Sequence, residues 1–129
     1  MMKNLFVFLG AILLLLSFSA SAQNKPGADN LKPYYLVLLK KGPHRDQDSA
    51  TASQIQKGHL ENINRMASAG KLNVAGPFLD EGDLRGIFIF DCSDENEVKQ
   101  LCDNDPAILS GRLIYEIHPW MTQKGTCFK

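Results

Sequence analysis

"HLENINRMASAGKLNVAGPFLDEGDLRGIFIFD", residues 59–91, changes its hydrophobic pattern after Gly70, and this change decides the fold. Before Gly70, apolar side chains recur every three or four residues, as they do in an amphipathic helix. After it, residues 71–78 and 84–91 form two short apolar runs separated by the turn sequence "DEGD". Two such runs joined by a short glycine-containing turn are typical of an antiparallel hairpin. The stretch therefore predicts a helix that is followed directly by two paired strands.

The segments on either side complete the pattern. "PYYLVLLK" (33–40) and "RLIYEIHP" (112–119) have the length and composition of strands. Helical periodicity begins near Ser49 and returns at residues 95–102, and a single helical turn is expected after Pro106. The predicted order is β-α-β-β-α-β, which indicates an α+β domain with the ferredoxin-like pattern.

The predicted strands are apolar on both faces. In "YYLVLL" and "GIFIF" polar and apolar residues hardly alternate. A ferredoxin-like domain covers only one face of its sheet with helices, and apolar strands need cover on both sides. A second copy that packs sheet against sheet is the simplest cover, so we predict a homodimer formed through the sheet faces.

The first 22 residues are predicted to be a secretory signal peptide. Lys3 precedes a continuous apolar run at 5–18, which is too short to span a membrane comfortably, and "SASAQ" supplies a small-residue cleavage site after Ala22. We therefore expect a secreted or periplasmic protein with no membrane association once the leader is removed. The predicted organisation is a signal peptide at 1–22, a polar tail at 23–32, one domain at 33–122 and a C-terminal tail at 123–129.

Charge and residue spacing exclude several classes of partner. The sequence carries 14 basic and 14 acidic residues, so no excess of positive charge points to nucleic acid. The three histidines and three cysteines show no spacing typical of metal ligands, and no phosphate-binding loop is present. We expect no metal and no cofactor. For Cys92 and Cys102, a disulfide and simple burial both remain open.

His59 is the ionisable residue whose position best suits chemistry. It falls on the apolar stripe of the predicted helix, four residues from both Ile55 and Ile63, so its ring should face the sheet. A histidine in this position can also be a core-edge residue that is satisfied by a backbone carbonyl or a tyrosine hydroxyl. Position alone leaves both roles open.

Asp80 is the predicted carboxylate partner of His59. The helix runs back about 16 Å from Gly70 to His59, and the next strand returns about 20 Å to the Gly76–Pro77 pair. An acid just beyond that pair should arrive at the level of His59. A His–carboxylate pair suits general acid–base catalysis or anion binding, whereas the alternative role of Asp80 is that of an ordinary turn residue.

The Gly76–Pro77 pair is expected to contribute backbone to the same pocket. Gly76 would allow a close backbone approach, and Pro77 would remove a hydrogen-bond donor and redirect the strand towards Asp80. Glu81 and Asp83, which follow in the turn, are expected to be solvated acids without a role in the pocket.

The chain resembles the YCII-related domain family between residues 34 and 120. The resemblance rests on the ordered set "YYLVLLK", "GHLENINRMASAGKLNVAGPFLD", "GIFIFD", "DENEV" and "DNDPAILSGRLIYEIHPW". It implies a dimeric α–β barrel of ferredoxin-like subunits and an active site built around a His–Asp pair, which would here be His59 and Asp80. A few members of the family resemble enzymes that act on small aromatic compounds, including dehalogenating ones.

Three functional hypotheses follow. The first is an exported enzyme in which His59 and Asp80 perform acid–base catalysis, lyase- or dehalogenase-like, on a small aromatic compound. The second is a non-catalytic module that binds an anionic or aromatic ligand in the same pocket. The third is a structural dimer in which His59 only fills the core.

Overall fold

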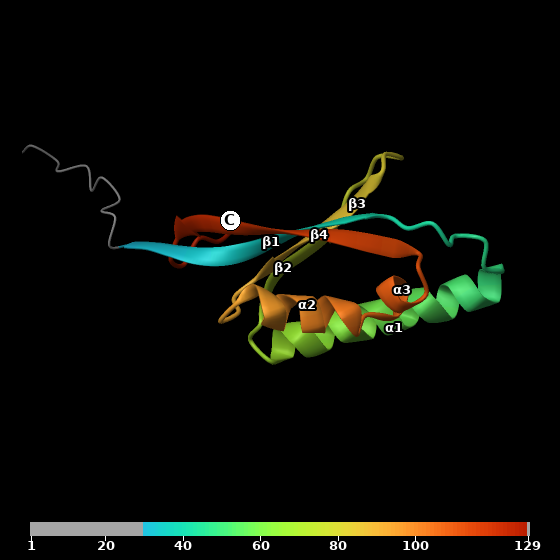
Figure 1. Ribbon diagram of the computed structural model, residues 1–129, viewed down its shortest axis with the longest axis horizontal. Helices are drawn as coiled ribbons and strands as arrows, with labels where there is room; N and C mark the ends of the chain where they lie inside the picture. The colour runs from blue at the N-terminus through green and yellow to red at the C-terminus, as the bar shows by residue number, and fades with distance from the viewer. Residues whose placement is uncertain (1–29, 129) are drawn as a thin grey trace, which may run out of the picture.

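The computed structural model describes residues 30–128 and contains one four-stranded sheet with its helices on a single face (Figure 1). The predicted signal peptide and most of the 23–32 tail lie outside the described residues. The elements are β1 (Leu31–Lys41), α1 (Ser49–Ser68), β2 (Leu72–Pro77), β3 (Leu84–Phe90), α2 (Glu95–Asp103), α3 (Pro106–Leu109) and β4 (Leu113–Gln123). The first strand therefore begins two residues before the expected Pro33, and the last one extends to Gln123.

The sheet has the strand order β2-β3-β1-β4, and all neighbouring strands are antiparallel. Cross-strand pairing sets Val37 of β1 between Phe88 of β3 and Ile117 of β4. Because residues paired directly across a sheet share one face, this row and its neighbours two residues away form the face that the helices cover. Element order and strand order together confirm the predicted α+β, ferredoxin-like fold.

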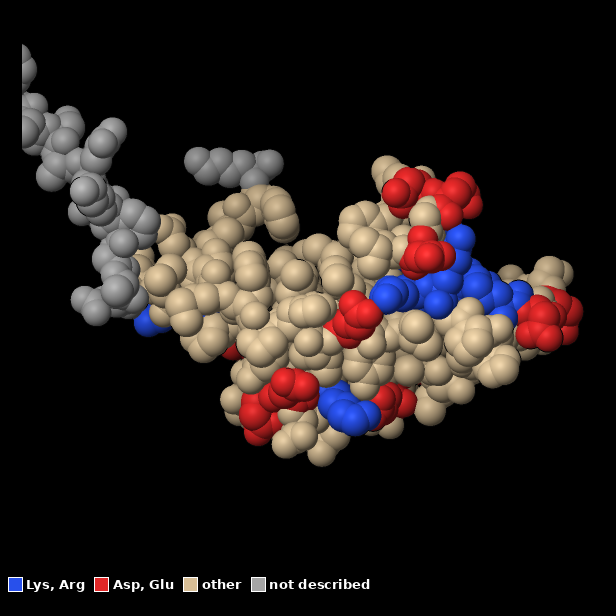
Figure 2. All heavy atoms as spheres, turned by 45° about the horizontal axis from the view of Figure 1, so that its top comes forward, with Lys and Arg blue, Asp and Glu red and all other residues tan. Residues whose placement is uncertain are grey.

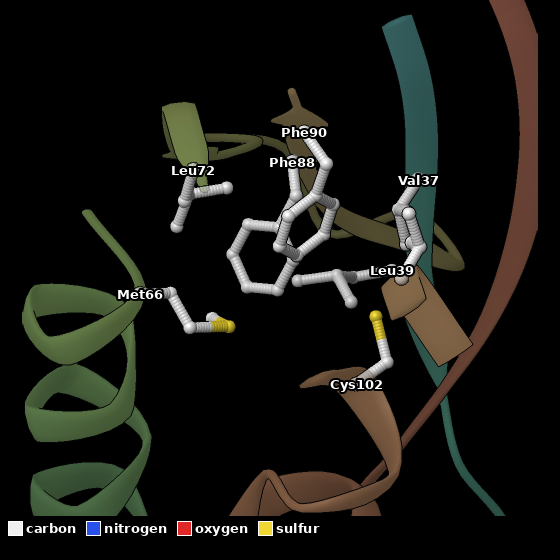
Figure 3. Close-up of a cluster of buried hydrophobic side chains, with 8 residues drawn as sticks. Val37, Leu39, Met66, Leu72, Phe88, Phe90 and Cys102 are labelled. Carbon is white, nitrogen blue, oxygen red and sulfur yellow. The ribbon is translucent and has the colours of Figure 1, made fainter. Parts of the chain in front are cut away.

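The hydrophobic core lies between this face and the helices (Figure 3). Its largest members, Phe88 and Phe90, pack edge to face with ring centroids 5.7 Å apart. Met66 reaches them from α1, and Cys102 enters from α2. Burial of these side chains holds both long helices against the sheet.

The opposite face of the sheet carries no helix among the described residues (Figure 1). Leu36 is paired with Ile89 and Leu38 with Ile87, so these four apolar side chains share that face. Trp120 on the neighbouring strand is 39% exposed. The sheet is thus apolar on both sides, as the sequence indicates, and the bare side is where we predict a second copy to pack.

Candidate active site

A cavity of about 380 Å³ opens between α1 and the helix-covered face of the sheet. This volume is in the range of small-molecule sites. His59, Gly76 and Pro77, three of the residues singled out from the sequence, line it together. The remaining lining residues are Leu39, Arg45, Ile55, Gln56, Leu60, Ile63, Ala75, Arg85, Gly86, Phe88, Ala107, Arg112 and Leu113.

His59 is buried, and its carboxylate partner is Asp105. The Nδ1 atom of His59 lies 2.8 Å from Oδ1 of Asp105, which directly precedes α3. On its other side the imidazole stacks on Phe88, with ring centroids 6.0 Å apart and planes inclined by 28°. The ring is therefore fixed by a hydrogen bond at one nitrogen and by an aromatic neighbour across its face.

Asp105 is completely buried and accepts hydrogen bonds through both oxygens. Oδ1 also accepts from the backbone N–H of Ala107, and Oδ2 accepts from Nδ2 of Asn62 at 2.8 Å. Burial alone would raise the pKa of Asp105, but the hydrogen bonds from His59 and Asn62 outweigh it and hold the pKa below its ordinary value. The carboxyl group is thus ionised at neutral pH.

An ionised acceptor at Nδ1 fixes the state of the His59 ring. Nδ1 must carry the proton that is shared with Asp105, so Nε2 of the neutral ring has a free lone pair. Every buried side-chain nitrogen or oxygen of the described residues has a hydrogen-bond partner. Because no hydrogen bond of these residues uses Nε2 of His59, this atom is not among the buried ones. Since His59 lines the cavity, Nε2 is open to it. A molecule in the cavity therefore meets a base when the ring is neutral and an acid when it is protonated.

Local sequence explains how a carboxylate reaches His59 from a distant segment. Asp105 caps the short helix α3, and Pro106 occupies the first helical position, an arrangement that both residue types favour. A Cβ atom on Gly58 would lie only 3.0 Å from Cγ of Pro106. The glycine inside α1 therefore lets α3 approach closely enough for Asp105 to meet His59.

The expected pairing of His59 with Asp80 is wrong. Asp80 is exposed in the turn between β2 and β3, and it does not line the cavity. Its carboxylate lies over its own turn, 3.6 Å from where a Cβ on Gly82 would sit. In Figure 1 this turn rises on the side of the sheet opposite to α1. The lengths of a helix and of the strand after it do not define the direction in which the hairpin leans. For this reason the pairing with Asp80 could not be judged from those lengths.

The Gly76–Pro77 pair lines the cavity but does not redirect the chain. Pairing of β2 with β3 continues through Pro77, and the N–H of Phe78 still donates to the carbonyl of Arg85 at 3.0 Å. A proline is tolerated here because β2 is an edge strand. The close backbone approach expected at Gly76 occurs at Gly86 instead, where a Cβ would lie 2.7 Å from the carbonyl oxygen of Gly76.

Sequence reasoning missed two residues of the site, Asp105 and Asn62. Asp105 directly precedes the single helical turn that is expected after Pro106, and Asp followed by Pro is itself a signal for a helix start. Asn62 is a polar residue, yet it follows His59 by three residues and precedes Met66 by four. That spacing places all three on one face, and all three are buried.

The described residues offer no metal ligand cluster and no activated thiol. Residues 30–128 contain no cluster of three or more His, Cys, Asp or Glu side chains that could hold a metal ion. Cys92 and Cys102 are both free thiols, and burial is the main cause that raises their pKa values to about 11 and about 12. Thiols with such pKa values are poor nucleophiles at neutral pH.

Within residues 30–128, no helix is long and apolar enough to cross a membrane.

Fold and site together define a ferredoxin-like α+β protein with a His–carboxylate pair beside a cavity of small-molecule size. The model of the YCII-related domain family matches residues 34–121, and the chain belongs to this family. The match covers β1 through most of β4, so it includes both His59 and Asp105.

Two solved structures share the fold at low sequence identity. One is the 5-chloro-2-hydroxyhydroquinone dehydrochlorinase TftG of Burkholderia phenoliruptrix AC1100, in complex with 2,5-dihydroxybenzoquinone; it has 22% identity, a TM-score of 0.50, and coverage of 67% of this chain and 92% of that one. The other is a muconolactone isomerase, with 14% identity, a TM-score of 0.57, and coverage of 74% and 96%. Both belong to the dimeric α–β barrel superfamily. No curated protein matches the chain.

Proposed function

We propose that this protein is an enzyme that acts on a small molecule, with His59 as general acid–base and Asp105 as its positioning residue. The observation that carries the proposal is the position of Nε2, which is open to the cavity while Nδ1 is held by a buried, ionised carboxylate. A carboxylate behind the ring fixes the tautomer and stabilises the imidazolium that forms when Nε2 takes a proton. Asp105 thus replaces Asp80 in the proposed pair.

The reaction class we propose is proton transfer to or from a bound small aromatic compound, lyase- or dehalogenase-like. The two solved structures that share the fold are a dehydrochlorinase and an isomerase. Removal of HCl needs a group that accepts a proton, and Nε2 of His59 is a base in the cavity lining whenever the ring is neutral.

Turnover measurements on matched variants test the proposal. With a chlorinated hydroxyhydroquinone as substrate, we expect the wild type to release chloride and His59→Gln to be inactive. The unchlorinated compound, which has no leaving group, is the substrate control. Asp105→Asn should lower kcat by roughly 10²–10⁴-fold, because it removes the carboxylate that fixes the tautomer. His118→Gln, on the exposed part of β4, should match the wild type. Binding without turnover in the wild type would indicate the non-catalytic binding module instead, and full activity in His59→Gln would refute the proposed role of His59.

We propose further that the protein is a homodimer through the bare sheet face. The apolar side chains of that face, and the superfamily to which both solved structures belong, support this assembly. A sheet-to-sheet contact would remove from water the apolar surface that no helix covers.

We also propose export, with removal of residues 1–22. The support is the order of a basic residue, an apolar run and an Ala-Ser-Ala sequence at the start of the chain. Mass spectrometry of the protein from its own host should show Gln23 as the first residue. A retained Met1 would contradict export by this route.

A further inference from the structure

Three arginines line the cavity together with His59. They come from separate segments: Arg45 from the loop between β1 and α1, Arg85 from β3, and Arg112 from the turn before β4. In Figure 2, basic side chains form a patch towards one end of the molecule, with acidic side chains above it and beyond it. One side of the cavity is therefore cationic, although the chain as a whole has no net charge.

Hydrogen bonds fix the guanidinium groups of Arg45 and Arg112. The N–H of Gly42 donates to the carbonyl of Arg112 at 2.8 Å. The two backbone segments approach so closely here that a Cβ on Gly42 would lie only 2.1 Å from the carbonyl oxygen of Gly111. The guanidinium of Arg45 donates to the same Arg112 carbonyl at 2.7 Å, and that of Arg112 donates to the side chain of Gln47 at 2.7 Å. The two groups are thus positioned before any ligand binds.

The positive charge of the three arginines is not neutralised. Arg85 donates to the carbonyls of Asp80 and Gly82, so all three use neutral acceptors. Within residues 30–128, no carboxylate lies within ion-pair distance of any of them, whereas Lys71, for example, pairs with Glu97 at 2.6 Å. Burial, followed by repulsion from Arg112 and Arg85, lowers the pKa of Arg45. Three like charges beside one cavity attract an anion.

The rest of the lining is apolar. Ile55 and Leu60 contribute from α1, Phe88 from β3 and Leu113 from β4. These side chains favour a hydrocarbon body, and His59 lies among them. A ligand that satisfies both parts has a compact apolar skeleton and one anionic group at the arginines.

We propose that the cavity takes a small organic carboxylate, whose anionic group is bound by Arg45 and Arg112 and whose apolar body lies against His59. This inference deepens the proposed function and rests on the same cavity. A carboxylate fits better than a point-like anion, because the planar guanidinium group pairs with two oxygens at once. The arginines act in binding, and His59 remains the group that moves a proton.

Benzoate and benzamide form the test pair, because they share size and shape and differ in charge. Calorimetric titration of the wild-type protein at low salt should show benzoate binding at least about tenfold more tightly than benzamide, since hydrogen bonds to charged groups are the stronger ones. High salt should weaken benzoate binding and leave benzamide nearly unchanged. Equal affinities, or no benzoate binding, would overturn the proposal, and this comparison needs no variant that has to fold.

Variants assign the effect to the arginines. Arg45→Gln and Arg112→Gln, each checked by thermal unfolding, should each weaken benzoate about tenfold and leave benzamide unchanged. Lys57→Gln is the control, because Lys57 is exposed on α1 and does not line the cavity. Unchanged benzoate affinity in both arginine variants would place the anion elsewhere and contradict the proposal.

His59→Gln separates this inference from the proposed function. The variant should still bind benzoate, since the arginines are intact, while turnover is lost. Retained turnover in His59→Gln together with arginine-dependent benzoate binding would refute the proposed function and leave the carboxylate site standing. Turnover that depends on His59 without any preference for benzoate would refute the carboxylate site and leave the proposed function standing.

Discussion

Nδ1 of His59 lies 2.8 Å from Oδ1 of Asp105, although 46 residues separate the two in the sequence. The hydrogen bond joins the middle of α1 to the start of α3. It is buried, and it leaves Nε2 open to the cavity. One contact therefore fixes the position of α3 and orients the group that we propose to be catalytic.

Loss of the Asp105 carboxylate should destabilise the fold strongly. Asp105→Ala leaves His59, Asn62 and the N–H of Ala107 without their buried acceptor, so we expect a loss of about 3–5 kcal/mol in the free energy of unfolding. Urea denaturation measures it. Asp80→Ala, in the exposed turn, is the matched control and should change stability by no more than about 0.5 kcal/mol. Comparable losses in the two variants would contradict the different roles assigned to the two acids.

The stabilising effect of Asp105 should disappear in acid. Its pKa in the folded protein lies below the ordinary value of about 3.9. A group of this kind stabilises the fold above its unfolded pKa, and the stabilisation is lost as the pH falls through the folded pKa. The difference in unfolding free energy between the wild type and Asp105→Asn should therefore narrow as the pH falls below about 4. A difference that stays constant into strong acid would mean that the carboxyl group is not ionised.

Gly58→Ala should fail to stabilise α1. At an open helix position this substitution would add about 1 kcal/mol to the free energy of unfolding. Here the new Cβ would lie 3.0 Å from Pro106 and push α3, with Asp105, away from His59. We expect no gain or a net loss in thermal stability, and reduced activity. Asn64→Ala on the exposed face of α1 is the control and should gain about 0.5 kcal/mol. A gain of about 1 kcal/mol in the free energy of unfolding of Gly58→Ala would show that α1 and α3 are not closely packed at this position.

A charge on the bare sheet face should dissociate the proposed dimer. Leu36 lies on that face beside Ile89, so Leu36→Glu would place a carboxylate in an apolar interface. The free energy needed to remove this unpaired charge from water would oppose association. Light scattering should report a dimer for the wild type and a monomer for Leu36→Glu. Leu109→Glu, at an exposed position on α3, should stay dimeric. A monomeric wild type, or a dimeric Leu36→Glu, would refute the assembly.

The sequence predicted the elements well because their signals are local. Periodicity marks α1 and places His59 on its inner face, and the short turn at 80–83 makes β2 and β3 a hairpin. The partner of His59 could not be found in this way. Asp105 belongs to a four-residue helix without periodicity, and its approach to α1 depends on how the helices pack. The lengths of α1 and β2 were not enough to place Asp80, which is exposed in the turn after β2 and does not line the cavity.

The tautomer of His59 tests the central claim most directly. Nitrogen-15 NMR of the imidazole, recorded at a pH where the ring is neutral, distinguishes a proton on Nδ1 from a proton on Nε2. We expect the proton on Nδ1 in the wild type and in Asp80→Asn, and a shift of population towards the Nε2-protonated form in Asp105→Leu, which removes the acceptor. A wild-type ring protonated on Nε2, or a ring whose tautomer does not respond to Asp105, would contradict the proposed role of the pair.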